Sequence, residues 1–261
     1  MSGLVPADIN QHYSYQGTKL NTRRQINKAS AAKLLTYSYL CSMEQGEKIP
    51  VLATAYMPPA AFWVAASRML KQTPGGGDGR PVLRLCRDEH YQKQTYRNRA
   101  VILNAQGEQR LSVPVSCPRG PYTKAEDVRI CYDKDWARDH WRSLCTAYNN
   151  SPYFLYYQDE LEAILMQSRY ERLWDLNLRL IAFFIKAFGL NWTVEAVSRR
   201  KAQEEAVAFS DKAPALWQTF APAVSPDAYQ NTFMLAVPCP ARLSACDLLF
   251  NYGPQAGQLF A

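Results

Sequence analysis

The sequence contains no apolar run long enough to cross a membrane. Its most apolar stretch, residues 180–190, is interrupted by Lys186, whereas a membrane-spanning helix needs about 20 mostly apolar residues in succession. The first residues also lack the continuous apolar segment of a secretory signal peptide. We therefore expect a cytoplasmic protein with no membrane span.

Closely spaced metal ligands and nucleotide-binding glycines are also missing. The 7 cysteines are scattered and form no CxxC pair, which favours reduced thiols over a disulfide framework. The close pairs Cys86 with His90 and His140 with Cys145 offer too few ligands for a structural zinc site. The glycines of residues 74–79 are not followed by the GK[ST] of a phosphate-binding loop. We expect no metal and no cofactor.

Acidic residues are fewer than basic ones. The chain has 30 lysines and arginines against 23 aspartates and glutamates, a formal net charge of +7, which favours acidic or phosphorylated partners. Its 48% hydrophobic and 20% charged residues are typical of a soluble globular protein, and its 261 residues allow one large domain. Charge alone leaves nucleotide sugars, nucleic acids and membrane surfaces as alternatives.

The densest polar cluster lies at residues 89–99, between two apolar runs. Its lysine and arginines can give charge-assisted hydrogen bonds to phosphate or carboxylate, and its tyrosine and asparagine side chains suit sugar or base hydroxyls and amides. We therefore predict a site for an anionic small molecule; the structural alternative is a solvated basic loop. The side chains that we assign to ligand binding are Lys93, Tyr96, Arg97, Asn98 and Arg99.

Hydrophobic patterns predict an α/β fold. Strands are expected at residues 49–55, 82–86, 100–104 and 110–115, with further strands at 128–131 and 191–197. Helices are expected at residues 60–71, 134–148, 152–166, 170–188 and 244–252. Because Gly107 lies in the turn between two of the strands, they are expected to form a β-hairpin. We predict a single domain at 49–261 with a central mixed β-sheet that includes the hairpin, flanking helices and a helical second half.

Residues 1–48 are expected to form a poorly ordered leader followed by a helix. Met43 lies just before the first expected strand. The sequence leaves open whether residues 1–42 extend the natural protein or come from an upstream start codon.

Two residues are candidates for catalysis. His140 lies one helical turn from Trp136, and a histidine there can move a proton near neutral pH; the structural alternative is a packed histidine bonded to a neighbour. Asp247 lies with Asn251 on the polar side of the terminal helix, and Asn251 is a ligand-binding candidate. Helix capping is the alternative explanation for Asp247.

Three more residues are assigned to ligand binding. Tyr56 and Pro58 follow the first expected strand, at the edge where open α/β sheets usually bind ligands. Asn177 falls on the apolar side of its helix, where an amide must find partners. Asn177 either links segments within the core or forms part of the site.

The candidates are expected to meet at one pocket. We predict that Arg97 and Arg99 do not both point into solvent, and that one reaches the Tyr56 turn or the terminal helix. We also predict that Asp247 docks against this basic cluster and that His140 joins the two.

Several short motifs follow one another in a defined order. They are Tyr56-Met57-Pro58-Pro59, Tyr91 to Arg99, Leu111 to Val115, Trp136 with His140-Trp141, Ser151 to Phe154, Asp175 with Asn177, and Asp247 to Pro254. Together they resemble the WbqC-like family over about 50–190 and again at 243–254. The glycine-rich segment that longer members carry before the terminal motif has no counterpart here, so the chain resembles a shorter branch.

The resemblance implies a role in bacterial O-antigen and surface-polysaccharide synthesis. The first hypothesis is a transferase acting on a nucleotide-activated amino sugar, in which the basic cluster holds phosphate and His140 or Asp247 moves a proton. The alternative is a non-catalytic module that binds a ligand or nucleic acid through the same cluster. Nucleic acid is the less favoured partner, because strand binding prefers a longer basic stripe interleaved with aromatic residues. The sequence does not predict the oligomeric state.

Overall fold

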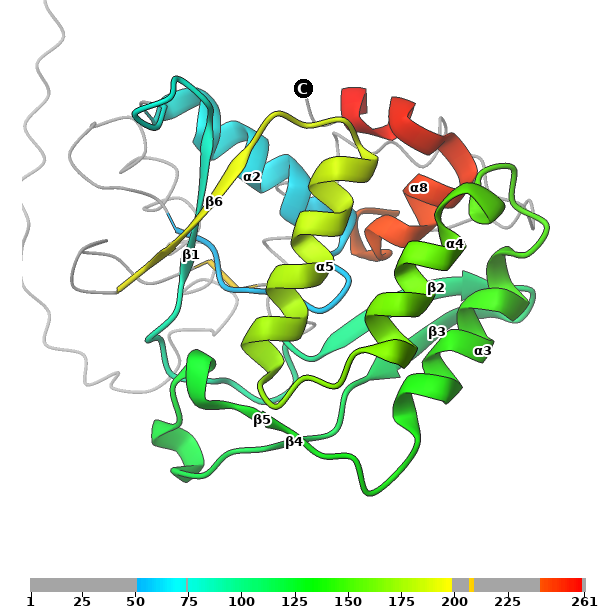
Figure 1. The fold of residues 1–261 in the computed structure, drawn as a ribbon, viewed down its shortest axis with the longest axis horizontal. Coiled ribbons are helices and arrows are strands. Elements are labelled where there is room, and N and C mark those ends of the chain that lie inside the picture. The colour runs from blue at the N-terminus through cyan, green and yellow to red at the C-terminus, as the bar shows by residue number, and fades with distance from the viewer. Residues whose placement is uncertain (1–50, 74, 199–206, 209–239, 260–261) are drawn as a thin grey trace, which may run out of the picture.

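The structure, a computed structural model, describes residues 51–73, 75–198, 207–208 and 240–259 (Figure 1). It confirms an α/β fold with a helical second half. The expected leader and helix at 1–48 lie outside the described residues, as does most of the chain between 198 and 240.

The helices match the expected positions closely. They are α2 (Ala60–Gln72), α3 (Trp136–Tyr148), α4 (Phe154–Glu162), α5 (Leu173–Ala187) and α8 (Ala245–Tyr252), with a π-helical turn at Ala163–Gln167. Short 3-10 turns lie at Gly120–Tyr122, Ala125–Asp127, Pro240–Arg242 and Gly253–Leu259. The strands are β1 (Val82–Cys86), β2 (Arg99–Asn104), β3 (Gly107–Ser112), β4 (Val115–Ser116), β5 (Arg129–Ile130) and β6 (Thr193–Val197).

The strands do not share one sheet, so that part of the prediction is wrong. The described strands form three two-stranded sheets: parallel β1–β6, and the antiparallel pairs β2–β3 and β4–β5. Within the described residues, the segment expected as a strand at 49–55 contributes isolated bridges from Leu52 to Leu85 and from Leu52 to Val207. In Figure 1 the β1–β6 pair and the β2–β3 hairpin lie on either side of α5.

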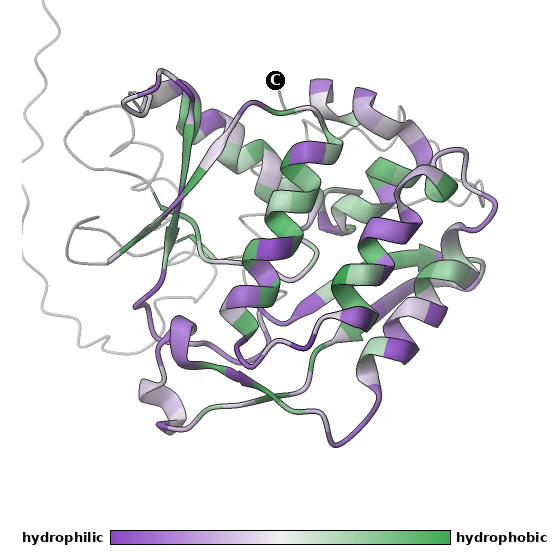
Figure 2. Ribbon diagram, in the orientation of Figure 1, coloured by the Kyte–Doolittle hydropathy of each residue, from purple (hydrophilic) through white to green (hydrophobic). Residues whose placement is uncertain are grey.

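Polar contacts from elsewhere in the chain explain why no other described strand joins the hairpin at β2. The backbone N–H of Ser244 donates to the Val101 carbonyl at 2.7 Å. The backbone N–H of Leu103 donates to the Tyr148 hydroxyl at 3.3 Å. Both groups lie on the edge of β2 that faces away from β3. The hydrogen-bonding positions of this edge are therefore occupied by side-chain and loop partners. Figure 2 shows that β2 is hydrophobic and that β3 is largely hydrophilic, as expected for an inner and an outer strand.

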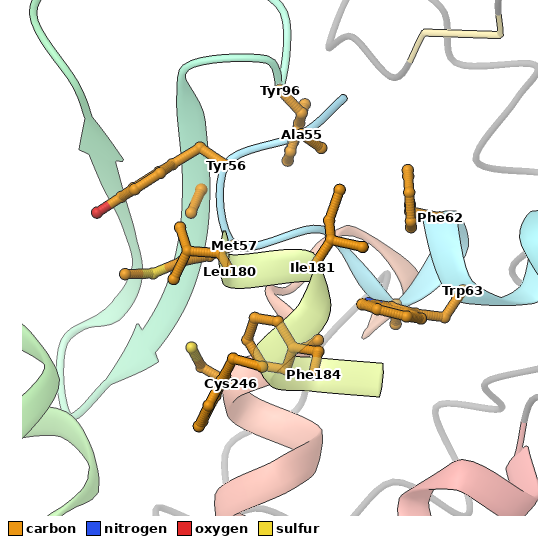
Figure 3. Close-up of a cluster of buried hydrophobic side chains, with 14 of the residues drawn as sticks. Ala55, Tyr56, Met57, Phe62, Trp63, Tyr96, Leu180, Ile181, Phe184 and Cys246 are labelled. Atoms are coloured by element: carbon orange, nitrogen blue, oxygen red, sulfur yellow. The ribbon is translucent and has the colours of Figure 1, made fainter. Parts of the chain in front are cut away.

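Helix α5 runs through the core. Its Phe184 ring packs against Trp63 of α2 with ring centroids 5.9 Å apart (Figure 3). Both side chains are fully buried, so replacing Trp63 by alanine should cost about 3–5 kcal/mol of folding free energy. This cluster supports the turn that carries Tyr56.

Helix α8 is capped at both ends. The Ser244 side chain accepts a hydrogen bond from the Cys246 N–H at 3.2 Å, which satisfies one of the free donors of the first turn. Gly253 ends the helix with a φ of +62°. The helix docks on the turn after Tyr56, where the Ala245 N–H donates to the Pro58 carbonyl at 2.8 Å.

Candidate functional site

Tyr56 and His140 form a hydrogen-bonded pair between the first described segment and α3. The Tyr56 hydroxyl lies 2.8 Å from His140 Nδ1, and both side chains are buried. The backbone N–H of Tyr56 donates to the Tyr96 carbonyl at 2.9 Å, which fixes the start of the turn. Figure 3 shows the hydroxyl pointing away from the apolar side chains around Met57.

The turn after Tyr56 has unusual backbone geometry. Met57 has a φ of +41°, and a non-glycine residue with positive φ costs about 1–3 kcal/mol and is held only where its surroundings fix it. Met57 is fully buried, and the Pro58 carbonyl is bound by α8. The strained turn thus gives Tyr56 its direction toward α3.

His140 is neutral near pH 7. Burial lowers the pKa of His140 to about 4, although Asp139 and a hydrogen bond with the Ser112 backbone partly oppose that effect. Since Nδ1 faces Tyr56, the ring hydrogen available to the Ser112 carbonyl is on Nε2. In this tautomer Nδ1 accepts the hydrogen bond that the Tyr56 hydroxyl donates.

Trp136 completes an aromatic wall around this pair. Its ring lies 5.3 Å from His140, 6.4 Å from Tyr56 and 5.8 Å from Tyr132, measured between centroids. Its Nε1 is buried and has no hydrogen-bond partner among the described residues. Trp136 and His140 are both buried. The indole N–H is a donor available to a ligand beside the Tyr56–His140 pair.

Arg97 is not available for a ligand phosphate in this structure. It is 3% exposed, and its Nε and Nη2 donate to the two carboxylate oxygens of Glu89 at 2.9 and 2.6 Å. The prediction that Arg97 and Arg99 do not both point into solvent is confirmed. The guanidinium of Arg97 binds Glu89, however, and not the Tyr56 turn or the terminal helix.

The other members of the basic cluster face different surroundings. Lys93 is exposed, Arg99 is partly buried and Tyr96 is buried. Asn98 Nδ2 donates to the Val113 carbonyl at 2.9 Å, which ties the start of β2 to the chain after β3. The assignment of these side chains to ligand binding remains a prediction.

Asn177 links separate segments of the core. Its Nδ2 donates to the Arg97 carbonyl at 2.8 Å and to Thr54 Oγ1 at 3.3 Å. It thereby ties α5 to two segments that are distant in sequence. Its Oδ1 is buried without a partner in the described part of the chain, so an acceptor is left for a water or a ligand.

Asp247 belongs to a second buried pair. Burial raises the pKa of Asp247 to about 7, and a hydrogen bond from Tyr148 opposes the rise. Its Oδ2 has no partner among the described residues. Helix capping does not explain its carboxylate, because the N–H of Ser244 is bound to Val101. Asn251 lies one turn later and donates to the Asp247 backbone carbonyl at 2.8 Å.

The predicted docking of Asp247 on the basic cluster does not occur. No ion pair joins Asp247 to Lys93, Arg97 or Arg99 among the described residues. The reason is that Arg97 is already paired with Glu89, and that the terminal helix docks on the Pro58 turn. The structure therefore brings together Tyr56 with His140, and separately Asp247 with Tyr148.

Tyr132, Trp136 and Tyr148 were not assigned to the site from the sequence. Tyr148 falls on the apolar stripe of α3, so its spacing predicted only a core position. Its link to Asp247 joins residues about 100 positions apart in sequence. Trp136 gave a usable signal, since it lies one turn from His140.

A separate open pocket of about 310 Å³ lies near the end of α5. None of the predicted site residues lines it. Glu160 and Lys186 in its wall form an ion pair at 2.9 Å. The lining residues are Tyr157, Glu160, Lys186, Ala187, Gly189 and Pro254.

The described ranges contain no cluster of three or more His, Cys, Asp or Glu side chains able to hold a metal ion. They also contain no helix with the length and apolar character needed to cross a membrane.

Comparison with known proteins gives one family match and one distant relative. The model of the WbqC-like protein family matches residues 83–225, more than half of the chain. An uncharacterized protein of Mycobacterium tuberculosis (strain ATCC 25618 / H37Rv) is 32% identical over 104 residues, which cover 40% of this chain and 45% of that protein. The match thus spans less than half of the relative's length. No solved structure matches the chain.

Proposed function

This chain belongs to the WbqC-like protein family, and we propose that it is a transferase that modifies the amino group of a nucleotide-activated sugar in bacterial surface-polysaccharide synthesis. The family resemblance supports the substrate class. The observation that carries the proposal of catalysis is the contact of 2.8 Å between the Tyr56 hydroxyl and neutral His140.

Transfer to an amine requires that the amine lose a proton. The amine nitrogen forms a bond to the transferred group as the bond from that group to its leaving group breaks. The attacking nitrogen then carries a positive charge and an acidic hydrogen. A base positioned within hydrogen-bond distance speeds such a step by about 100- to 10,000-fold.

Tyr56 and His140 can provide that base together. The Tyr56 oxygen accepts the amine hydrogen while its own proton moves to His140 Nδ1. The Tyr56 hydroxyl then gives that hydrogen to the departing group and takes its own proton back from His140 Nδ1. Burial raises the pKa of Tyr56 well above its usual value, so the tyrosine transmits a proton and does not remain ionised.

The alternative of a nucleic-acid module receives less support. A strand-binding surface needs a long run of available cations, and Arg97 in the centre of the basic cluster is neutralised by Glu89. The cations left outside this pair suit a small phosphate-bearing ligand better than a strand.

The test is a transfer assay on the full chain. Nucleotide-activated amino sugars are incubated with acyl donors, and the products are identified by mass spectrometry. We expect Tyr56→Phe to lower turnover by at least about 100-fold, while Tyr157→Phe, which removes a hydroxyl elsewhere, leaves it unchanged. Equal turnover in both variants, or no product and no binding with any sugar, would overturn the proposal.

A further inference from the structure

Arg169 lies over the face of the Tyr132 ring, close to the aromatic wall of the candidate site. Its guanidinium carbon is 4.5 Å from the ring centroid, a distance typical of a cation–π contact. Arg169 is exposed and belongs to the connection between the π-helical turn and α5. Sequence reasoning gave no reason to select it.

The backbone next to Arg169 is held on Tyr132. The Tyr132 hydroxyl donates to the Tyr170 carbonyl at 3.1 Å and accepts from the Tyr170 N–H at 3.1 Å. The following residues run along β5, where the Ile130 N–H donates to the Glu171 carbonyl at 3.0 Å. Tyr132 thus supports both the backbone beside Arg169 and the Arg169 side chain. Little conformational freedom of Arg169 is therefore left to be lost when a ligand binds.

The guanidinium has no carboxylate partner within the described residues. Glu171, the acidic residue nearest to Arg169 along the chain, lies 3.6 Å from Arg129 and pairs with it instead. The planar fork of Arg169 is therefore available for a bidentate contact with an oxyanion. The unpartnered indole N–H of Trp136 is a second donor in the same aromatic wall.

We propose that Arg169, supported by Tyr132, binds a phosphate group of the substrate whose reacting group lies at the Tyr56–His140 pair. The Tyr132 ring contacts Trp136 at 5.8 Å, and Trp136 contacts His140 at 5.3 Å. The anion site and the proton-accepting pair are thus at opposite ends of one wall of rings. A nucleotide sugar has this layout, because its diphosphate is attached to the ring that carries the amine. The assignment to a sugar substrate rests on the proposed function; the anion site itself does not.

The experiment is calorimetric titration of the full chain with inorganic pyrophosphate and, separately, with a nucleoside diphosphate at constant ionic strength. We expect Arg169→Gln to weaken binding by about 10- to 100-fold, the effect of losing a charged hydrogen-bond donor. Tyr132→Phe keeps the ring and removes the backbone support, so it should weaken binding by a smaller factor. The control is Arg142→Gln, an exposed arginine of α3, which should bind as the wild type does.

The outcomes separate this inference from the proposed function. Equal binding by Arg169→Gln and Arg142→Gln, or no binding by the wild type, overturns the anion site. His140→Gln should still bind the anion, because the imidazole is not its ligand. Binding that depends on Arg169 without any transfer activity keeps the anion site and removes the transferase. Tighter binding of the nucleoside diphosphate than of pyrophosphate assigns the site to a nucleotide, and equal binding assigns it to phosphate alone.

Discussion

Arg97 and Glu89 form a bidentate ion pair in the interior, with Nε and Nη2 of the arginine on the two carboxylate oxygens. The pair fixes the stretch that leads into β2, since the Arg97 carbonyl also accepts the hydrogen bond from Asn177. The central cation of the basic cluster therefore holds the chain in place, and ligand binding by its outer cations remains a prediction.

Breaking this pair should destabilise the protein strongly. Glu89→Gln leaves the guanidinium buried without a counter-charge, and we expect the free energy of unfolding to fall by about 3–5 kcal/mol in denaturant titrations. The control is Glu126→Gln, which loses contacts of 3.8 Å with the exposed side chains of Arg87 and Lys124 and should cost less than about 1 kcal/mol. Similar effects of the two substitutions would contradict the structural role of the pair.

Asp247 should make the protein less stable as the pH rises. Its pKa in the folded chain is about 7, above its ordinary value of 3.8, so the folded state keeps a proton that the unfolded state has lost. Stability is therefore complete below pH 4 and is lost as the pH rises to about 7, by up to about 4 kcal/mol. Asp247→Asn should abolish this loss in melts between pH 5 and 8.

The matched control for Asp247 is an exposed carboxylate. Asp175→Asn, in the first turn of α5, should keep the pH dependence of the wild type. If Asp247→Asn also kept it, the carboxyl group would not be the source of the effect.

His140 should act in the opposite direction. Its pKa is lowered from 6.5 to about 4 in the folded chain, so the unfolded state binds a proton first. Stability is complete above pH 6.5 and falls by about 3 kcal/mol as the pH decreases to 4. His140→Gln should remove most of this acid-induced loss, and a pH profile unchanged by the substitution would argue against a buried neutral imidazole.

Gly253 offers a test of the terminal helix. A Cβ at this position would lie 2.6 Å from the Tyr153 ring, and φ is +62°. Gly253→Ala should therefore combine backbone strain with a clash and cost more than about 2 kcal/mol. Gly189→Ala provides the comparison, because Gly189 has a φ of +64° with nothing within 4 Å of its Cβ position; it should cost about 1 kcal/mol.

Local signals in the sequence predicted most of the elements. Gly107 has a φ of +112° and begins β3 directly after the hairpin turn, and Ser244 caps α8, as their neighbours in sequence indicate. The α3 and α5 helices follow from apolar residues repeated every three to four positions. Such signals act within one element, so they do not say which strands pair.

Long-range pairing and the buried polar contacts could not be predicted in this way. The partner of β1 is β6, more than 100 residues later, and no local pattern selects it. Charged residues that follow one another in sequence usually lie on the surface. The sequence therefore predicts a ligand, and not Glu89, as the binding partner of Arg97. Tyr56 and His140 were both selected as candidates, but their contact depends on the strained Met57 turn, which apolar spacing does not reveal.

The contacts that close the outer edge of β2 have a consequence for solubility. An uncovered strand edge offers free N–H and C=O groups to strands of other molecules, and it promotes aggregation. Here the backbone of Ser244 and the hydroxyl of Tyr148 occupy those groups. A chain ending at residue 239 would lose the hydrogen bond from the Ser244 backbone. It would also lose α8 and, with it, the packing of Phe250 on Tyr148. The last segment thus protects the hydrophobic hairpin from pairing with another copy of itself.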